Sequence, residues 1–96
     1  MPTFAKTAQF KRDWASLTHE QRQAVRRALT KFLADLRSGR FRKGLRVKGV
    51  QGAPGIFEMT WADDGRATFQ YGPEIIRGEP HVVWRRIGTH DVLNHP

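Results

Sequence analysis

The stretch Ile56–Tyr71, which reads IFEMTWADDGRATFQY, decides the fold because two alternating segments flank a tight turn. Its Asp63-Asp64-Gly65 sequence is typical of a β-hairpin turn and predicts strands over Ile56–Trp61 and Arg66–Tyr71. Successive side chains of a strand point to opposite faces, so this hairpin has an apolar face and a polar face. The apolar face is expected to pack on helices and comprises Phe57, Met59, Trp61, Ala67, Phe69 and Tyr71. The polar face is expected to stay open and carries Glu58, Thr60, Arg66, Thr68 and Gln70.

A third strand is expected over His81–Ile87, and its alternation is uneven. Val82, Trp84 and Arg86 would share one side of a regular strand, so neither side is uniformly apolar. A β-bulge would resolve this conflict, and so would a Trp84 that faces the open side of the sheet. The last residues, Leu93–Pro96, are expected to form a frayed tail.

The strongest chemical signal is the pentapeptide Arg86–His90, RIGTH, at the end of this third strand. Histidine changes its charge near neutral pH, and arginine grips a phosphate through two hydrogen bonds. If Arg86 faces the open side of the sheet, it joins Glu58 and Arg66. The glycine of the pentapeptide would let the chain bend and bring His90 over the same surface. From the pattern alone, a weak cross-strand ion pair between Glu58 and Arg66 is an equally good explanation of these two residues.

The first part of the chain predicts one short strand and two helices. A strand is expected over Pro2–Ala5, and a helix over Gln9–Ser16 with Thr7 as its N-cap. A longer helix begins at Thr18, which forms a capping box with Gln21. The apolar stripe of this helix is expected in the core and consists of Val25, Leu29, Phe32, Leu33 and Leu36.

The order of these elements predicts an α+β fold with two layers. Phe41–Val50 is basic and carries no expected strand, and Gly72–Pro80 is expected to be a long loop. A strand, two helices and a three-stranded antiparallel meander therefore follow one another, with the helices covering one face of the sheet. A chain of 96 residues is expected to form a single domain over 1–96.

Charge is the main compositional signal. Lys and Arg total 17 against nine Asp and Glu, which gives a formal net charge of +8. The excess favours nucleic acid, an anionic membrane surface or an acidic protein as partner. No cysteine is present, so disulfides and thiolate metal sites are excluded. No apolar run approaches the length of a membrane span, and neither a signal peptide nor a transmembrane segment is expected.

In its order of elements and in short motifs, the chain resembles the RelE/ParE superfamily of toxins from type II toxin–antitoxin modules. The motifs are Gly44–Val50 (GLRVKGV), Ile56–Met59 (IFEM), an arginine, Arg66, that opens the second hairpin strand, and Gly88–Asp91 (GTHD). The resemblance covers nearly the whole chain. With Arg86 shortly before the last motif, the ending is most similar to the YafQ-like members, which cleave messenger RNA on the ribosome.

The resemblance implies a ribosome-dependent endoribonuclease that cleaves mRNA without a metal ion or cofactor, by attack of the RNA 2′-OH. His90 would be the general acid or base, and Arg66 and Arg86 would stabilise the charge that develops on the phosphate. Glu58 would be the base or would orient an arginine. The implied partners are mRNA, the ribosome and an acidic antitoxin that neutralises the basic surface, in the cytoplasm.

Basic residues outside this set are candidates for contacts with RNA phosphates, namely Lys43, Arg46, Lys48, Arg22 and Arg26. Three alternatives stay open. A ParE-like inhibitor of DNA gyrase would have no use for His90. A non-catalytic RNA- or ribosome-binding module would use the basic residues only. The third alternative is an inactive relative without toxicity. It stays open because Leu93 and Asn94 stand where YafQ-like proteins place an aromatic residue after the histidine.

Overall fold

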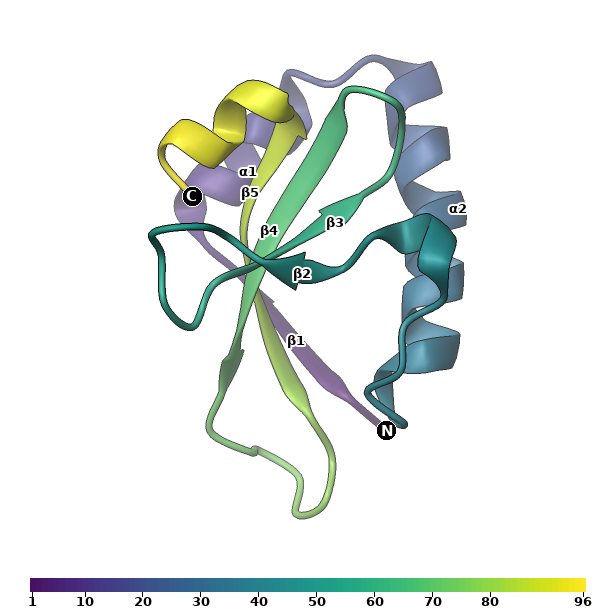
Figure 1. The fold of residues 1–96 in the computed structure, drawn as a ribbon, viewed down its shortest axis with the longest axis vertical. Coiled ribbons are helices and arrows are strands. Elements are labelled where there is room, and N and C mark those ends of the chain that lie inside the picture. Colours follow the sequence, from purple (N-terminus) through teal and green to yellow (C-terminus); the bar gives the residue numbers. More distant parts are fainter.

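Five strands form one mixed sheet in the computed structural model, which describes residues 1–96 (Figure 1). The spatial order is β1-β5-β4-β3-β2. β1 runs parallel to β5, and every other neighbouring pair is antiparallel. The strands are β1 (Thr3–Lys6), β2 (Lys48–Gly49), β3 (Phe57–Thr60), β4 (Gly65–Gly72) and β5 (His81–Thr89). The predicted α+β class and the antiparallel meander of β3, β4 and β5 are confirmed.

The expectation that the basic segment before the hairpin contains no strand is wrong. Lys48 pairs with Glu58 and Gly49 pairs with Phe57, so β2 adds an edge to the sheet. A short 3-10 turn, Lys43–Leu45, precedes β2 and buries Leu45 in the core. Two residues carry no periodic pattern, and their strand conformation comes from pairing with β3 rather than from local propensity.

Both helices have the N-cap residues that the sequence indicates, and each begins within one residue of the expected position. α1 (Ala8–Ala15) is capped by Thr7, whose Oγ1 accepts a hydrogen bond from the Phe10 backbone N at 3.0 Å. α2 (His19–Leu36) has the complete capping box of Thr18 and Gln21, with reciprocal bonds of 3.1 and 2.8 Å. These bonds satisfy backbone N–H groups that have no partner inside the first helical turn.

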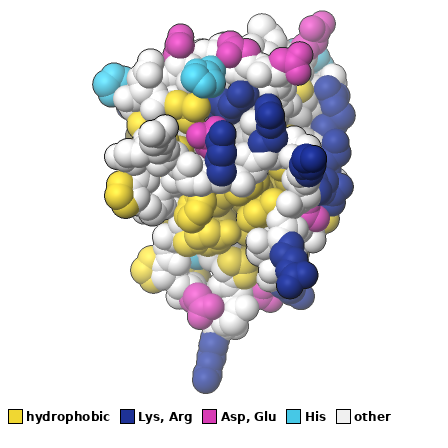
Figure 2. Space-filling model, in the orientation of Figure 1, with side chains coloured by type: hydrophobic (Ala, Val, Ile, Leu, Met, Phe, Trp, Pro, Cys, Tyr) yellow, Lys and Arg dark blue, Asp and Glu magenta, His cyan; other side chains and the backbone are white.

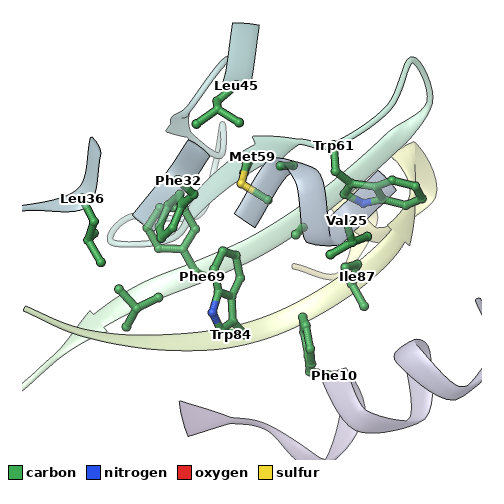
Figure 3. Packing of buried hydrophobic residues seen from close by; sticks show 13 residues of the cluster. Phe10, Val25, Phe32, Leu36, Leu45, Met59, Trp61, Phe69, Trp84 and Ile87 are labelled. Carbon is green, nitrogen blue, oxygen red and sulfur yellow. The ribbon is translucent and has the colours of Figure 1, made fainter. Parts of the chain in front are cut away.

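The core lies between the helices and one face of the sheet (Figure 3). Phe32 of α2 is fully buried, and its ring lies 5.2 Å from Phe69 and 5.1 Å from Trp84. The prediction that Leu33 and Tyr71 lie in the core is wrong, because both residues are exposed. Leu33 lies at the border of the helix stripe, about 100° around the helix from Phe32. Tyr71 packs edge-on against Phe69 but is left 43% exposed.

A β-bulge in β5 explains the uneven alternation of apolar and polar residues along His81–Ile87. Thr68 pairs with Arg86 and Phe69 pairs with Trp84, so Arg85 is the extra residue without a partner. The extra residue reverses the alternation, and it brings Val82, Trp84 and Ile87 to the core, where all three are buried. The predicted bulge is therefore confirmed, and Trp84 faces the helices rather than the open side.

The chain end is ordered against the sheet, so the expectation of a frayed tail is wrong. A 3-10 turn over His90–Asn94 follows β5 directly and buries Val92. The main-chain oxygen of Pro96 then accepts hydrogen bonds from Thr68 Oγ1 at 3.2 Å and Arg85 Nε at 3.0 Å. These contacts, together with Val92, fold the last residues back over the sheet.

Candidate nucleic-acid site on the open face of the sheet

A cavity of about 500 Å³ opens on the side of the sheet away from the helices. β2, β3, β4 and the 3-10 turn after β5 each contribute to it. Figure 2 shows this side of the molecule, with Lys and Arg side chains gathered around a carboxylate and a histidine above them. The cavity is lined by Lys48, Gly49, Val50, Gln51, Glu58, Arg66, His90 and Leu93. Three of the four predicted catalytic residues therefore share one cavity.

Arg66 is held at the start of β4 by the hairpin turn. Its Nη1 donates hydrogen bonds to the carbonyl oxygens of Ala62, Asp63 and Gly65, at 3.3, 3.2 and 2.9 Å. Its Nε lies 3.8 Å from Glu58 Oε1, which is an ion pair without a hydrogen bond. The Nη2 atom has no hydrogen-bond partner within the chain. One edge of the guanidinium is thus fixed, and donors remain for an anion in the cavity.

Glu58 presents a carboxylate that is largely buried and accepts no hydrogen bond from the protein. The residue is 6% exposed, and the long contact to Arg66 is its only ion pair. It lies on the central part of β3, directly opposite Lys48 of β2. A buried carboxylate is normally paired or hydrogen-bonded. The carboxylate of Glu58 instead keeps its acceptor capacity for a group that enters the cavity.

His90 begins the 3-10 turn after β5 and is exposed, with no hydrogen bond to another residue. Gly88 of β5 pairs with Arg66 of β4 and has no side chain. A Cβ at Gly88 would lie 3.1 Å from Val92 Cγ1, so glycine lets the turn pack closely against the strand. The buried Val92 and the small Gly88 together hold His90 at the rim of the cavity.

The fourth predicted residue, Arg86, lies elsewhere. Its Nε and Nη2 donate to the two carboxylate oxygens of Asp13 on α1, at 2.7 and 3.3 Å, and its Nη1 donates to the His95 carbonyl oxygen at 3.1 Å. These residues line a separate cavity of about 370 Å³ together with Asp91. The structure does not bring Arg86 together with Glu58, and its guanidinium joins α1, β5 and the chain end.

Asp13 is the buried centre of this contact. Burial tends to raise the pKa of Asp13, but hydrogen bonds from Arg86, Gln9 and the Ile87 backbone N hold that pKa below its ordinary value. The Ile87 N–H lies 3.1 Å from Oδ2 and the Gln9 amide lies 2.8 Å from Oδ1. The carboxylate is therefore charged and fully engaged near neutral pH.

The predicted RNA-binding residues separate into two groups. Lys48 lines the cavity, and Lys43 and Arg46 are exposed in the segment that leads into β2. Arg22 and Arg26 lie in the helical layer, where both guanidinium groups sit over the Trp14 ring, at 5.6 and 5.5 Å. Arg22 also donates to the Trp14 and Ala15 carbonyl oxygens at the end of α1.

Arg46 adopts a left-handed backbone conformation, with φ of 49°. Residues other than glycine seldom adopt this conformation, because the Cβ crowds the backbone. The backbone at Arg46 follows the 3-10 turn and redirects the chain into β2. Arg46 therefore has a structural role in the turn of the chain, in addition to its charge.

Arg85 is a residue of the open face that the sequence argument does not include. Its Nη1 donates to Gln70 Oε1 at 2.6 Å, and its Nε donates to the Pro96 main-chain oxygen. The uneven alternation of the third strand is the signal that could have found it, because a bulge turns two successive side chains toward one face. No comparable signal marks Asp13, whose partner lies 73 positions away.

The structure shows neither a metal-ligand cluster nor a membrane-spanning helix. No group of three His, Cys, Asp or Glu side chains is arranged so that it could hold a metal ion. No helix combines the length and the apolar character that crossing a membrane requires.

Comparison with known proteins finds similar structures but no similar sequence. No protein-family model and no curated protein matches the chain. A chain of the DinJ–YafQ complex from E. coli is 16% identical, with a TM-score of 0.70 over 97% of this chain and 98% of that one. The RelB–RelE antitoxin–toxin complex from Methanococcus jannaschii gives 11% identity and a TM-score of 0.61, over 96% and 99%. A metal-bound toxin from Helicobacter pylori is 16% identical, with a TM-score of 0.62 over 95% of this chain and 97% of that one.

These likenesses show that the chain has the RelE-like toxin fold, as the sequence resemblance predicts. Each likeness covers at least 95% of this chain and of the chain compared with it. Two of the three similar structures are complexes of a toxin with its antitoxin.

Proposed function

We propose that this protein is the toxin of a type II toxin–antitoxin module and cleaves mRNA on the ribosome. The observation that carries the proposal is the cavity on the open sheet face, which combines Glu58, Arg66, Lys48 and His90. RNA supplies its own nucleophile, the 2′-OH. The protein must then supply a proton acceptor, a proton donor and positive charge for the phosphate, and these four side chains include all three kinds of group.

Glu58 is assigned as the general base, because its carboxylate accepts no hydrogen bond from the protein. It would take the proton of the 2′-OH as the 2′-oxygen attacks the adjacent phosphorus. His90, exposed at the rim, is assigned as the general acid that gives a proton to the departing 5′-oxygen. The bond between phosphorus and the 5′-oxygen breaks, and the products are a 2′,3′-cyclic phosphate and a 5′-hydroxyl end.

Arg66 and Lys48 are assigned to the phosphate. The Arg66 guanidinium is fixed by three carbonyl groups of the hairpin turn, and its Nη2 is available to the non-bridging oxygens. A fixed donor stabilises developing charge without having to reorganise during the reaction. Arg86 is a positioning residue in this scheme, because it contacts the His95 carbonyl oxygen at the end of the turn that begins with His90.

An acidic antitoxin and a cytoplasmic location belong to the same proposal. The net charge of +8 favours a partner of opposite charge, and the DinJ–YafQ and RelB–RelE structures are complexes with antitoxins. Ribosomes and their mRNA are the substrate of the proposed reaction, and they place it in the cytoplasm.

The test compares wild type with His90→Gln and His19→Gln, each expressed without an antitoxin. His19 is also exposed, but it lies at the start of α2 and contacts only Gln23 by its side chain. We expect wild type and His19→Gln to stop growth and cleave translated mRNA, and His90→Gln to cleave about 10²–10⁴-fold more slowly. Equal cleavage by His90→Gln, or no cleavage by wild type in the presence of ribosomes, would contradict the proposal.

A further inference from the structure

A second cavity, of about 180 Å³, lies in the helical layer on the other side of the sheet. It reaches the centre of the core, because Val25, Met59, Ala67 and Ile87 line it and are each at most 2% exposed. Figure 3 shows three of these side chains, from α2, β3 and β5, converging in the same part of the core as Trp84. The remaining lining residues are Lys6, Phe10, Lys11, Trp14, Leu29 and Trp84.

The inner walls of this cavity carry almost no polar groups. Eight of its ten lining residues are hydrophobic, and the only charged ones are lysines. An engineered apolar cavity of roughly 150 Å³ in another protein stays dry and takes up benzene. A cavity of about 180 Å³ with aromatic and aliphatic walls therefore has the size and the chemistry to take one aromatic ring.

The two lysines give the cavity its charge. Lys6, at the end of β1, and Lys11, on α1, are both exposed, so they belong to the mouth rather than to the deep walls. Neither forms an ion pair with an acidic residue of the chain, and no Asp or Glu lines the cavity. Two uncompensated ammonium groups at the mouth of an apolar cavity select an anion over a neutral or cationic molecule of the same shape.

We propose that this cavity binds a small aromatic carboxylate. The ring lies in the apolar interior against Trp84 and Ile87, and the carboxylate lies at the mouth between Lys6 and Lys11. This site is separate from the proposed ribonuclease site, because the sheet lies between them. It does not depend on that function.

Phenylacetate is the probe, and the three tryptophan indole N–H signals in NMR report where it binds. Trp14 and Trp84 line the cavity, whereas Trp61 lies against Gly65 and lines a different one. We expect phenylacetate to shift the Trp14 and Trp84 signals saturably, with a dissociation constant on the order of 1 mM or tighter, and to leave Trp61 in place. Phenethylamine, which carries an ammonium group on a similar ring, should bind at least about fivefold more weakly.

The variants test the role of charge without touching the core. Lys6→Gln combined with Lys11→Gln should weaken phenylacetate binding about fivefold and leave the affinity for neutral 2-phenylethanol unchanged. Lys31→Gln is the matched control, since Lys31 is an exposed lysine of α2 that lines another cavity. The proposal is overturned if phenylacetate shifts no Trp14 or Trp84 signal, or if Trp61 moves to the same extent. The proposal is also overturned if phenethylamine binds as tightly as phenylacetate, or if Lys31→Gln loses as much phenylacetate affinity as the double variant.

Discussion

Asp13 on α1 and Arg86 on β5 form a two-point contact, with Nε–Oδ2 and Nη2–Oδ1 distances of 2.7 and 3.3 Å. Oδ2 also accepts the Ile87 backbone N–H at 3.1 Å, so one carboxylate ties the first helix to the last strand. Only 10% of the Asp13 side chain and 24% of the Arg86 side chain are exposed. The arginine that the sequence motif offers for catalysis is thus a structural link between the two ends of the chain.

This contact predicts a specific loss of stability in acid. The pKa of Asp13 in the folded protein lies below its ordinary value of 3.8. The charged carboxylate therefore stabilises the fold fully above about pH 4, and that contribution is lost as the pH falls through the folded-state pKa. Urea unfolding at pH 7 should show Asp13→Asn to be less stable by about 1–3 kcal/mol. Between pH 4 and pH 2, wild type should lose stability more steeply than Asp13→Asn, and parallel curves would contradict this account.

Replacement of Gly88 should affect the position of His90. A Cβ at Gly88 lies 3.1 Å from Val92 Cγ1, so Gly88→Ala pushes the 3-10 turn away from β5. We expect about 1 kcal/mol of lost stability from this crowding, and a loss of RNA cleavage that is larger than the unfolded fraction explains. Gly44→Ala is the control, because a Cβ there meets no atom within 4 Å. Full cleavage by Gly88→Ala would show that the position of the turn does not matter.

Replacement of Lys48 should change the salt dependence of RNA binding, whereas replacement of Arg22 should change the stability of the fold. Lys48 lines the cavity, so Lys48→Gln should weaken single-stranded RNA binding and reduce the slope of log affinity against log salt by about 0.7. Arg22 donates to carbonyl oxygens at the end of α1 and lies over Trp14, so Arg22→Gln should lower stability by about 1 kcal/mol. The same change should leave the salt slope unaltered. The reverse pattern would place the RNA on the helical layer.

The sequence predicts those parts of the fold that local signals determine. The Asp-Gly turn, the Thr18 capping box and the alternation of the hairpin each act within a few residues, and the structure confirms all three. The bulge is one of two explanations that the uneven alternation offers, because a conflict in alternation is visible within a single strand. This alternation alone predicts that Glu58 and Arg66 lie on the open face.

Features that depend on distant contacts were beyond such reasoning. β2 is two residues long and exists through its pairing with β3. The strand pattern leaves the side of Arg86 open, and the residue that engages its side chain, Asp13, lies 73 positions earlier. The chain end was expected to fray, yet Pro96 is held by Thr68 and Arg85. In each case the partner cannot be found from local periodicity.

The central claim is that the RNA 2′-OH attacks the phosphate within the Glu58, Arg66 and His90 cavity. The most direct measurement uses purified protein, ribosomes and an mRNA whose cleaved nucleotide is either the ribose or the 2′-deoxy form. The account predicts cleavage of the ribose form only, with 2′,3′-cyclic phosphate and 5′-hydroxyl ends. Cleavage of the 2′-deoxy form, or products with 3′-hydroxyl and 5′-phosphate ends, would contradict it.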